Sequence, residues 1–175
     1  MLTVRKVTEG SPEFDRIVTL YERSFPENER RPLEPLLRDS TGSSDFLSFF
    51  SENTFVGFAA LLTLGDISHI LYFAIEEHMR NSGFGSEALR CIHRLKAGCR
   101  ILADLEAEDP GAANNDQRKK RRRFYLLNGY TVSEVHYRWR QESYEIFVCG
   151  GDITNEEFAA FWHHFEQTDS GLSQY

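Results

Sequence analysis

Cysteine, proline and long apolar stretches are all scarce in this chain of 175 residues. Its three cysteines, Cys91, Cys99 and Cys149, are an odd set without metal-ligand spacing, which argues against a disulfide framework and against a metal site. The longest apolar run, residues 55–64, is far shorter than the ~20 residues that a membrane-spanning helix needs. The N-terminus lacks an apolar signal region. We therefore expect a protein of the reducing cytoplasm with no membrane partner and no metal.

An excess of positive charge is also lacking, since the formal net charge is −7. This balance argues against general nucleic-acid binding and favours cationic acceptors such as amines. A hydrophobic content of 41% is enough for a buried core in one globular unit of this length. We expect a folded domain over residues 1–150 and an amphipathic helix within residues 151–175 that packs on the same domain. A homodimer contact or a wall of an acceptor site are the alternatives for that helix.

Hydrophobic periodicity and turn residues predict an α/β chain. The expected strands are 3–8, 46–50, 54–64, 67–75, 100–107, 130–140 and 143–149, and the expected helices are 11–24, 34–39, 83–97, 117–128 and 154–167. The first helix is expected to begin with Ser11 as its N-cap and Pro12 at the first helical position. The three strands within 45–75 form an antiparallel meander, and the strand, helix and strand across 67–107 form a right-handed crossover.

The most informative feature is the loop Arg80-Asn81-Ser82-Gly83-Phe84-Gly85, which joins an apolar strand to a helix. A helix N-terminus presents unpaired backbone N–H groups and the positive end of the helix dipole to an anion. Gly83 and Gly85 lack a Cβ, so diphosphate oxygens can approach the main chain, and Arg80 can add a charge-assisted contact. The loop therefore predicts a phosphate site, although an ordinary strand-to-helix turn has the same pattern.

Two segments resemble the GNAT acyltransferase superfamily. The order strand, R-x-x-G-x-G, helix resembles the family's acyl-CoA binding segment, and Phe124-Tyr125-Leu126-Leu127-Asn128-Gly129-Tyr130 resembles its F-Y-x-x-x-G-F/Y element. The resemblance spans about residues 1–150. It implies an α/β fold with a mixed, mostly antiparallel sheet of six to seven strands and a V-shaped split between the fourth and fifth strands. Four helices plus a C-terminal helix would flank this sheet.

The resemblance also implies a function. The chain would be an N-acetyltransferase that moves an acetyl group from acetyl-CoA directly to a primary amine of a small molecule or peptide. No metal and no covalent enzyme intermediate are implied. The alternatives are a non-catalytic acyl-CoA-binding regulatory module and, more remotely, an adaptor that binds RNA or peptide.

The residues of the implied site follow from the family pattern. Pantetheine would pair with the fourth-strand backbone, and the diphosphate would lie on the glycine loop. The implied acyl-CoA residues are Phe73, Ala74, Ile75, Arg80, Asn81, Ser82, Gly83, Phe84, Gly85 and Ser86. The loop between the first two helices often roofs the acceptor site in this family, which suggests Phe25, Glu27, Glu29 and Arg30 as acceptor contacts.

Tyr125 takes the place of the family's tyrosine near the thioester sulfur. A phenol with a pKa of ~10 is a suitable acid for a leaving thiolate of comparable basicity. The alternative is that Tyr125 is an aromatic residue of an amphipathic helix, packing with Phe124 and Tyr130. Gly129 is expected to adopt a left-handed conformation at the helix C-terminus.

A general base is harder to assign from the sequence. Asp104, Glu106 and Glu108 recur at every second position of a strand and so share one face. Glu106 is the predicted base, with Glu108, Glu76 and His69 as alternatives. Acidic residues at a strand end are also often simply solvated.

The run Arg118-Lys119-Lys120-Arg121-Arg122-Arg123 contains six consecutive cations on a predicted helix. One interpretation is a solvated basic turn balanced by Glu106, Glu108, Asp109 and Asp116. The other is that the run attracts the CoA phosphates. The family often has an asparagine seven or eight residues before its tyrosine, where this chain has Arg118 and Gln117.

Overall fold

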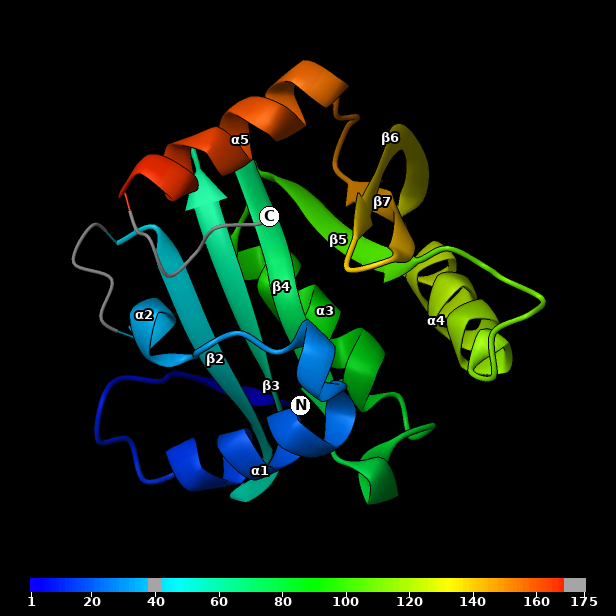
Figure 1. Ribbon diagram of the computed structural model, residues 1–175. Coiled ribbons are helices and arrows are strands. Elements are labelled where there is room, and N and C mark those ends of the chain that lie inside the picture. The colour runs from blue at the N-terminus through cyan, green and yellow to red at the C-terminus, as the bar shows by residue number, and fades with distance from the viewer. Residues whose placement is uncertain (38–41, 169–175) are drawn as a thin grey trace. The chain divides into compact units, whose positions relative to one another are not determined.

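The computed structural model describes residues 1–37 and 42–168. It divides the chain into two compact units, Met1–Ala97 and Gly98–Tyr175. The elements of both units are shown in Figure 1. The acyl-CoA and acceptor residues implied by the sequence lie in the first unit, and the two predicted catalytic residues lie in the second.

The first unit is an antiparallel sheet with helices packed on it. Its elements are β1 (Thr3–Lys6), α1 (Phe14–Ser24), the 3₁₀ turn η1 (Glu27–Glu29), α2 (Glu34–Leu37), β2 (Ser44–Ser51), β3 (Thr54–Leu64), β4 (Ile67–Ile75), the 3₁₀ turn η2 (Glu77–Met79) and α3 (Phe84–Leu95). The four strands pair in sequence order. Helix α1 packs on β3 and β4, and α3 packs on β4 (Figure 1). The predicted meander is confirmed.

Helix α1 begins later than the sequence predicts. It starts at Phe14 with Glu13 as N-cap, rather than at Pro12 with Ser11 as N-cap. The reason is that the Ser11 hydroxyl accepts a hydrogen bond from the Thr8 backbone N–H at 2.9 Å, so it closes a turn instead of capping the helix. The predicted end of the second helix, residues 38–39, lies outside the described residues.

The second unit is a three-stranded antiparallel sheet with two helices. Its elements are β5 (Arg100–Glu106), α4 (Asn115–Leu127), β6 (Thr131–Trp139), β7 (Glu142–Cys149) and α5 (Asn155–Thr168). Strand β7 pairs with both β5 and β6. Helix α5 begins with a capping box, because the Thr154 hydroxyl accepts from the Glu157 N–H at 3.2 Å and the Glu157 carboxylate accepts from the Thr154 N–H at 3.0 Å.

The predicted fold class is confirmed as mixed α/β with mostly antiparallel strand pairing. Within the described ranges the structure has seven strands and five α-helices, as the sequence implied. The position of a split in the sheet and the division of the chain at residue 150 stay predictions. No helix in the described part of the chain is long and apolar enough to cross a membrane.

Candidate functional site

The glycine loop follows the 3₁₀ turn η2, beyond the end of β4, and enters α3 through two left-handed residues. Arg80 folds back over the strand end, since its Nε donates to the Ile75 carbonyl at 2.9 Å. Asn81 and Gly83 then take φ angles of 61° and 84°. Asparagine and glycine are the residues that tolerate this conformation best, which explains why they stand at these positions. The turn leads directly into the first residue of α3, Phe84.

The Arg80 N–H donates to the Glu77 carbonyl at 3.2 Å, whereas the backbone amides after it have no partner among the described residues. The first bond of α3 runs from the Glu87 N–H to the Gly83 carbonyl at 3.0 Å, and no side chain caps the helix at Gly83. Among the described residues, the N–H groups of residues 81–86 have no hydrogen-bond acceptor. Residues 80–83 are also exposed. These amides and the helix dipole can therefore receive an anion.

The implied pantetheine residues lie on β4, where one backbone edge is paired with β3. Phe73, Ala74 and Ile75 stand opposite Ala59, Phe58 and Gly57. Sequence reasoning missed the role of Gly57 in the close packing of β3 against β4. A Cβ built on it would lie 2.2 Å from the Ala74 carbonyl oxygen, so only glycine allows β3 to approach β4 this closely. The available signal was a glycine inside a strand pattern.

The implied acceptor loop, residues 25–30, lies against β4. Phe25 is the C-cap of α1, and its carbonyl accepts from the Arg30 Nε at 2.8 Å. Tyr72 of β4 donates from its hydroxyl to the Glu29 carbonyl at 3.3 Å, and its ring meets the Phe25 ring edge-on at 5.0 Å. The structure thus brings two of the predicted acceptor residues, Phe25 and Glu29, next to Tyr72, the residue before Phe73. Glu27 is exposed on the 3₁₀ turn.

Tyr21 fixes the same loop from helix α1, a role that sequence reasoning missed. Its hydroxyl donates to the Arg31 carbonyl at 3.0 Å and accepts from the Arg31 N–H at 2.7 Å. Its ring packs edge-on against Tyr72 at 4.8 Å. Burial raises the pKa of Tyr21, opposed by its hydrogen bonds to Tyr72 and Arg31. The phenol is therefore a neutral structural group that holds Arg31, at the end of the loop, while its ring packs on Tyr72 of the sheet.

In the second unit, the F-Y-x-x-x-G-Y segment forms the C-terminal end of α4. Gly129 takes a φ of 86°, which confirms the predicted left-handed conformation. The Gly129 N–H donates to the Leu126 carbonyl and the Tyr130 N–H to the Tyr125 carbonyl, each at 3.2 Å. This pattern is a Schellman motif. It turns the chain so that the Tyr130 ring packs edge-on against Tyr125 at 5.0 Å.

Tyr125 is buried, with 8% of its surface exposed. Burial raises its pKa above the ordinary value of 10.0, the negative charge of Asp104 raises it further, and the positive charge of Arg121 opposes both. The phenol stays protonated at neutral pH as a result. Its hydroxyl has no hydrogen-bond partner in the part of the chain that the structure describes. The protonated hydroxyl can therefore act as a hydrogen-bond donor.

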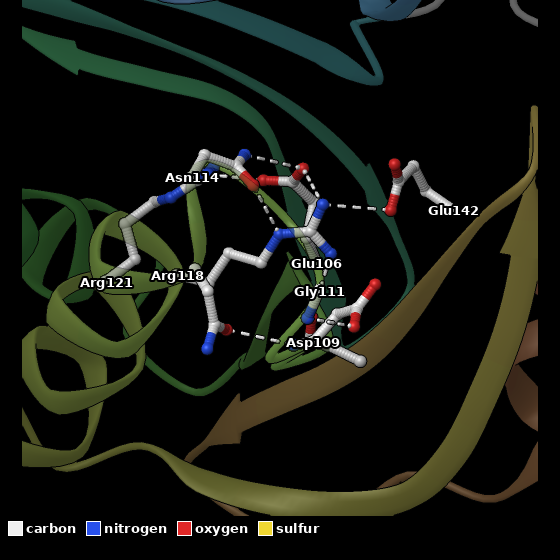
Figure 2. A network of polar contacts seen from close by, with 9 residues as sticks. Glu106, Asp109, Gly111, Asn114, Arg118, Arg121 and Glu142 are labelled. Atoms are coloured by element: carbon white, nitrogen blue, oxygen red, sulfur yellow. Dashed lines mark hydrogen bonds and ion pairs between the residues drawn. The ribbon is translucent and has the colours of Figure 1, made fainter.

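Glu106 stands at the centre of a network of polar contacts, seen from close by in Figure 2. Its carboxylate pairs with the guanidinium of Arg118 at 3.2 Å, with that of Arg121, and with the amide of Asn114 at 3.3 Å. The side chains of Glu106 and Arg118 are 5% and 4% exposed. Arg118 also donates to the Ala107 carbonyl at 2.9 Å and to the Glu142 carboxylate at 3.0 Å. Glu106 therefore takes part in a buried ion-pair cluster.

The basic run divides between this cluster and the surface. Arg122 pairs with Glu108 at 3.7 Å and with Glu145. The prediction that Glu106 and Glu108 balance part of the run is confirmed. Lys119, Lys120 and Arg123 are exposed. Asp109 instead shapes the preceding loop, where it accepts from the Gly111 N–H at 2.8 Å (Figure 2).

The other predicted candidates for a base occupy different surroundings. Glu76 pairs with Arg23 of α1 at 3.0 Å. His69 lies within β4 and is 0% exposed. Across residues 1–37 and 42–168, no group of three histidine, cysteine or acidic side chains is arranged to hold a metal ion.

A family model matches the chain in sequence, and solved structures resemble it in fold. The model of the acetyltransferase (GNAT) family matches residues 14–130. A GNAT-family protein from Bacteroides thetaiotaomicron superposes with a TM-score of 0.76 and 21% identity, covering 98% of this chain and 99% of that one. A GNAT family acetyltransferase from Elizabethkingia anophelis with acetyl-CoA bound has a TM-score of 0.57 and 13% identity, covering 85% and 97% of the two chains.

An aminoglycoside 6'-N-acetyltransferase complexed with coenzyme A also shares the fold. Its TM-score is 0.64 at 13% identity, and the match covers 83% of this chain and 95% of that one. At identities this low, structural likeness shows a shared fold. No curated protein matches the chain in sequence.

Proposed function

The chain belongs to the GNAT acetyltransferase family, and from this premise we propose that it is an N-acetyltransferase that uses acetyl-CoA. The acetyl group would pass directly to a primary amine of a small molecule or peptide. Two proteins of the same fold bind acetyl-CoA or coenzyme A, which supports the choice of donor. The acceptor class rests on the aminoglycoside acetyltransferase and on the net charge of −7, which favours cationic acceptors.

The observation that carries this proposal is the set of unused amides at residues 81–86. Together with the Arg80 guanidinium, they form an anion-binding loop at the start of α3. We assign to this loop the diphosphate of acetyl-CoA. The backbone of β4 at Phe73, Ala74 and Ile75 is assigned to pantetheine, because amide groups pair with a strand as an added strand does.

Tyr125 is assigned as the acid that protonates the leaving thiolate. Its pKa is raised mainly by burial, so the phenol keeps its proton at neutral pH and has one to give as the C–S bond breaks. Residues Phe25, Glu27, Glu29 and Arg30 are assigned to the acceptor site, because their loop is tied to β4 through Tyr72.

Binding of acetyl-CoA by variants of the loop tests the first part of the proposal. Arg80→Ala removes a charge-assisted contact of ~1.5 to 3 kcal/mol, so calorimetry should show affinity lower by ~10- to 100-fold. Arg90→Ala is a matched control, because Arg90 is an exposed arginine within α3. Equal affinity of the wild type for acetyl-CoA and for acetyl-pantetheine, which lacks the diphosphate, would contradict the assignment of the loop.

Turnover tests the second part. A panel of amines with detection of the released thiol should reveal an acceptor, and Tyr125→Phe should lower kcat by ~10²- to 10⁴-fold with unchanged acetyl-CoA affinity. Unchanged kcat in this variant would remove Tyr125 from the mechanism.

One observation favours a second candidate function, a non-catalytic acyl-CoA-binding regulatory module. Glu106, the base predicted from sequence, lies in a buried cluster with Arg118 and Arg121. A protein that retains the anion-binding loop but has no competent base would bind acetyl-CoA without turnover. Tight binding of acetyl-CoA without thiol release on any amine of the panel would favour this module over the enzyme.

A further inference from the structure

One side of α4 carries cations that the protein itself does not neutralise. The helix packs on β5 (Figure 1), and the paired arginines of the basic run contact acidic side chains of the same unit. The other three cations of the run, Lys119, Lys120 and Arg123, are exposed. Among the described residues, none of these three side chains has an ion-pair or hydrogen-bond partner. Their positive charge is therefore available to a ligand from solution.

The three cations share one face of the helix with two exposed leucines. Residues 119, 123, 126 and 127 are spaced at i, i+4, i+7 and i+8, and residue 120 precedes 123 by three positions. Leu126 is 45% exposed and Leu127 is 75% exposed. Within the described ranges four large apolar side chains are exposed, and two of them are these leucines. We call this surface the basic–leucine face of α4.

The stability of the helix does not explain this arrangement. Lys119 and Arg123 are four residues apart, and like charges at this spacing repel each other. Lys120 and Arg123 are three residues apart and repel each other in the same way. Asp116 is the only acidic residue of α4, and within the described part of the chain its carboxylate pairs with none of the three cations. An anion bound from outside would relieve the repulsion.

The overall charge and the leucines decide what kind of anion suits the face. The net charge of −7 opposes the approach of extended polyanions, such as nucleic acid or an anionic membrane. A short segment that lies on the face meets mainly the local cations, because charges further away than a Debye length of ~8 Å are screened. Phosphate groups alone would leave Leu126 and Leu127 exposed, whereas a peptide can cover them with apolar side chains.

We propose that the basic–leucine face of α4 is a docking surface for an acidic segment of a partner protein, in which carboxylates are interspersed with large apolar side chains. The carboxylates pair with the three exposed cations, and the apolar side chains cover the two leucines. The proposal concerns the second unit alone and does not depend on the proposed acetyltransferase function. Each exposed ion pair contributes little, so the binding is expected to be weak and sensitive to salt.

Selection from a phage-displayed library of random peptides tests this proposal on the full chain. The wild type is the bait, and the variant Lys119→Glu/Lys120→Glu/Arg123→Glu serves for counter-selection. Glutamate is a good helix former, so α4 should still form in this variant, which circular dichroism verifies. The enriched peptides should be rich in Asp and Glu and should contain Leu, Phe or Trp. A failure to enrich any peptide, or enrichment of peptides without acidic residues, would overturn the proposal.

The affinity of a synthetic copy of the most enriched peptide, measured by fluorescence polarisation, tests the single residues. Arg123→Glu should weaken binding by ~3- to 10-fold. Arg138→Glu, at an exposed arginine of β6, changes the net charge equally and should leave the affinity within ~2-fold. Leu127→Ser should weaken binding by ~3- to 10-fold, and Leu95→Ser, at an exposed leucine of α3, is its control. Equal losses in a variant and its control would contradict the docking surface.

Other ligands for the same cations are further outcomes of the test. Mixed-sequence single-stranded RNA could bind the wild type more tightly than the selected peptide and lose this binding in the triple variant, which would replace the acidic segment with nucleic acid. The same result with vesicles of phosphatidylserine and phosphatidylcholine would replace it with a membrane surface. Calorimetry with acetyl-CoA separates the CoA phosphates. We expect the triple variant to lose the peptide and keep its acetyl-CoA affinity, and an equal loss of both would overturn the proposal.

Discussion

Arg118→Met is the substitution whose effect on stability can be worked out most fully from the structure. The methionine keeps much of the apolar stem of Arg118 but removes the guanidinium. That group contacts the Glu106 and Glu142 carboxylates at 3.2 and 3.0 Å, the Ala107 carbonyl at 2.9 Å and the Asn114 amide oxygen at 2.9 Å. We expect the variant to fold with a markedly lower free energy of unfolding.

The size of the loss in unfolding free energy depends on the contacts that Glu106 and Glu142 retain once the Arg118 guanidinium is gone. Removing one member of a buried ion pair costs ~3 to 5 kcal/mol, because the remaining charge is left unpaired. Here Glu106 retains Arg121 and Asn114, and the side chain of Glu142 is 38% exposed and can be hydrated. These two facts place the loss at the low end of the range, about 3 kcal/mol. Part of this loss comes from the missing hydrogen bond to the Ala107 carbonyl, which is left without its arginine donor.

Urea unfolding followed by tryptophan fluorescence measures this loss. Both tryptophans of the chain, Trp139 and Trp162, lie in the second unit, so the signal reports the unit that contains Arg118. With a slope of ~1 to 3 kcal/mol per molar urea, the midpoint should fall by ~1 to 3 M. Arg123→Met, an exposed arginine of the same helix, should change the free energy by no more than ~0.5 kcal/mol. A loss below ~1 kcal/mol for Arg118→Met would refute the reasoning.

Three further predictions concern other parts of the chain. Gly129→Ala should lower the free energy of unfolding by ~1 to 2 kcal/mol in the same urea assay, because its φ is 86°. Gly57→Ala should cost ~1 to 3 kcal/mol and weaken acetyl-CoA binding in calorimetry, because the new methyl group would meet the Ala74 carbonyl at 2.2 Å. Burial lowers the pKa of His93 below 6.5, so the unfolded chain binds a proton on this residue more readily than the folded protein does. The free energy of unfolding should therefore fall as the pH drops below about 6.5. In His93→Gln, the decline of Tm between about pH 7 and pH 5 should therefore be flatter.

Local sequence signals predicted most of the secondary structure. The glycine loop, the meander and the capping box of α5 each depend on residues close together in the chain, and each is confirmed. The start of α1 was wrong because a hydroxyl can cap a helix or close a turn, and Ser11 closes a turn with Thr8. The residue types alone do not show whether the Ser11 hydroxyl will accept a hydrogen bond from the helix N-terminus or from the preceding turn.

The surroundings of the candidate site could not be predicted in the same way. Tyr21 and Tyr72 hold the acceptor loop through hydrogen bonds to the backbone of residues 31 and 29. The sequence does not distinguish these two tyrosines from others whose hydroxyl groups make no such bond. The contact of Tyr137 with Asp104 joins β6 to β5 across β7 and depends on strand register. Register is fixed by the whole packed face rather than by neighbouring residues.

The basic run illustrates why composition alone gave two open interpretations. Residues 118, 121 and 122 are spaced at i, i+3 and i+4, so they lie on one face of α4, and these are the members that pair with acidic side chains of the second unit. The members at 119, 120 and 123 lie on other faces and are exposed. The acidic partners of the first interpretation are therefore confirmed for one face of the helix, whereas the attraction of the CoA phosphates stays a prediction. Any attraction of the CoA phosphates would have to come from the exposed face, because the cations of the paired face already neutralise Glu106, Glu108 and Glu145.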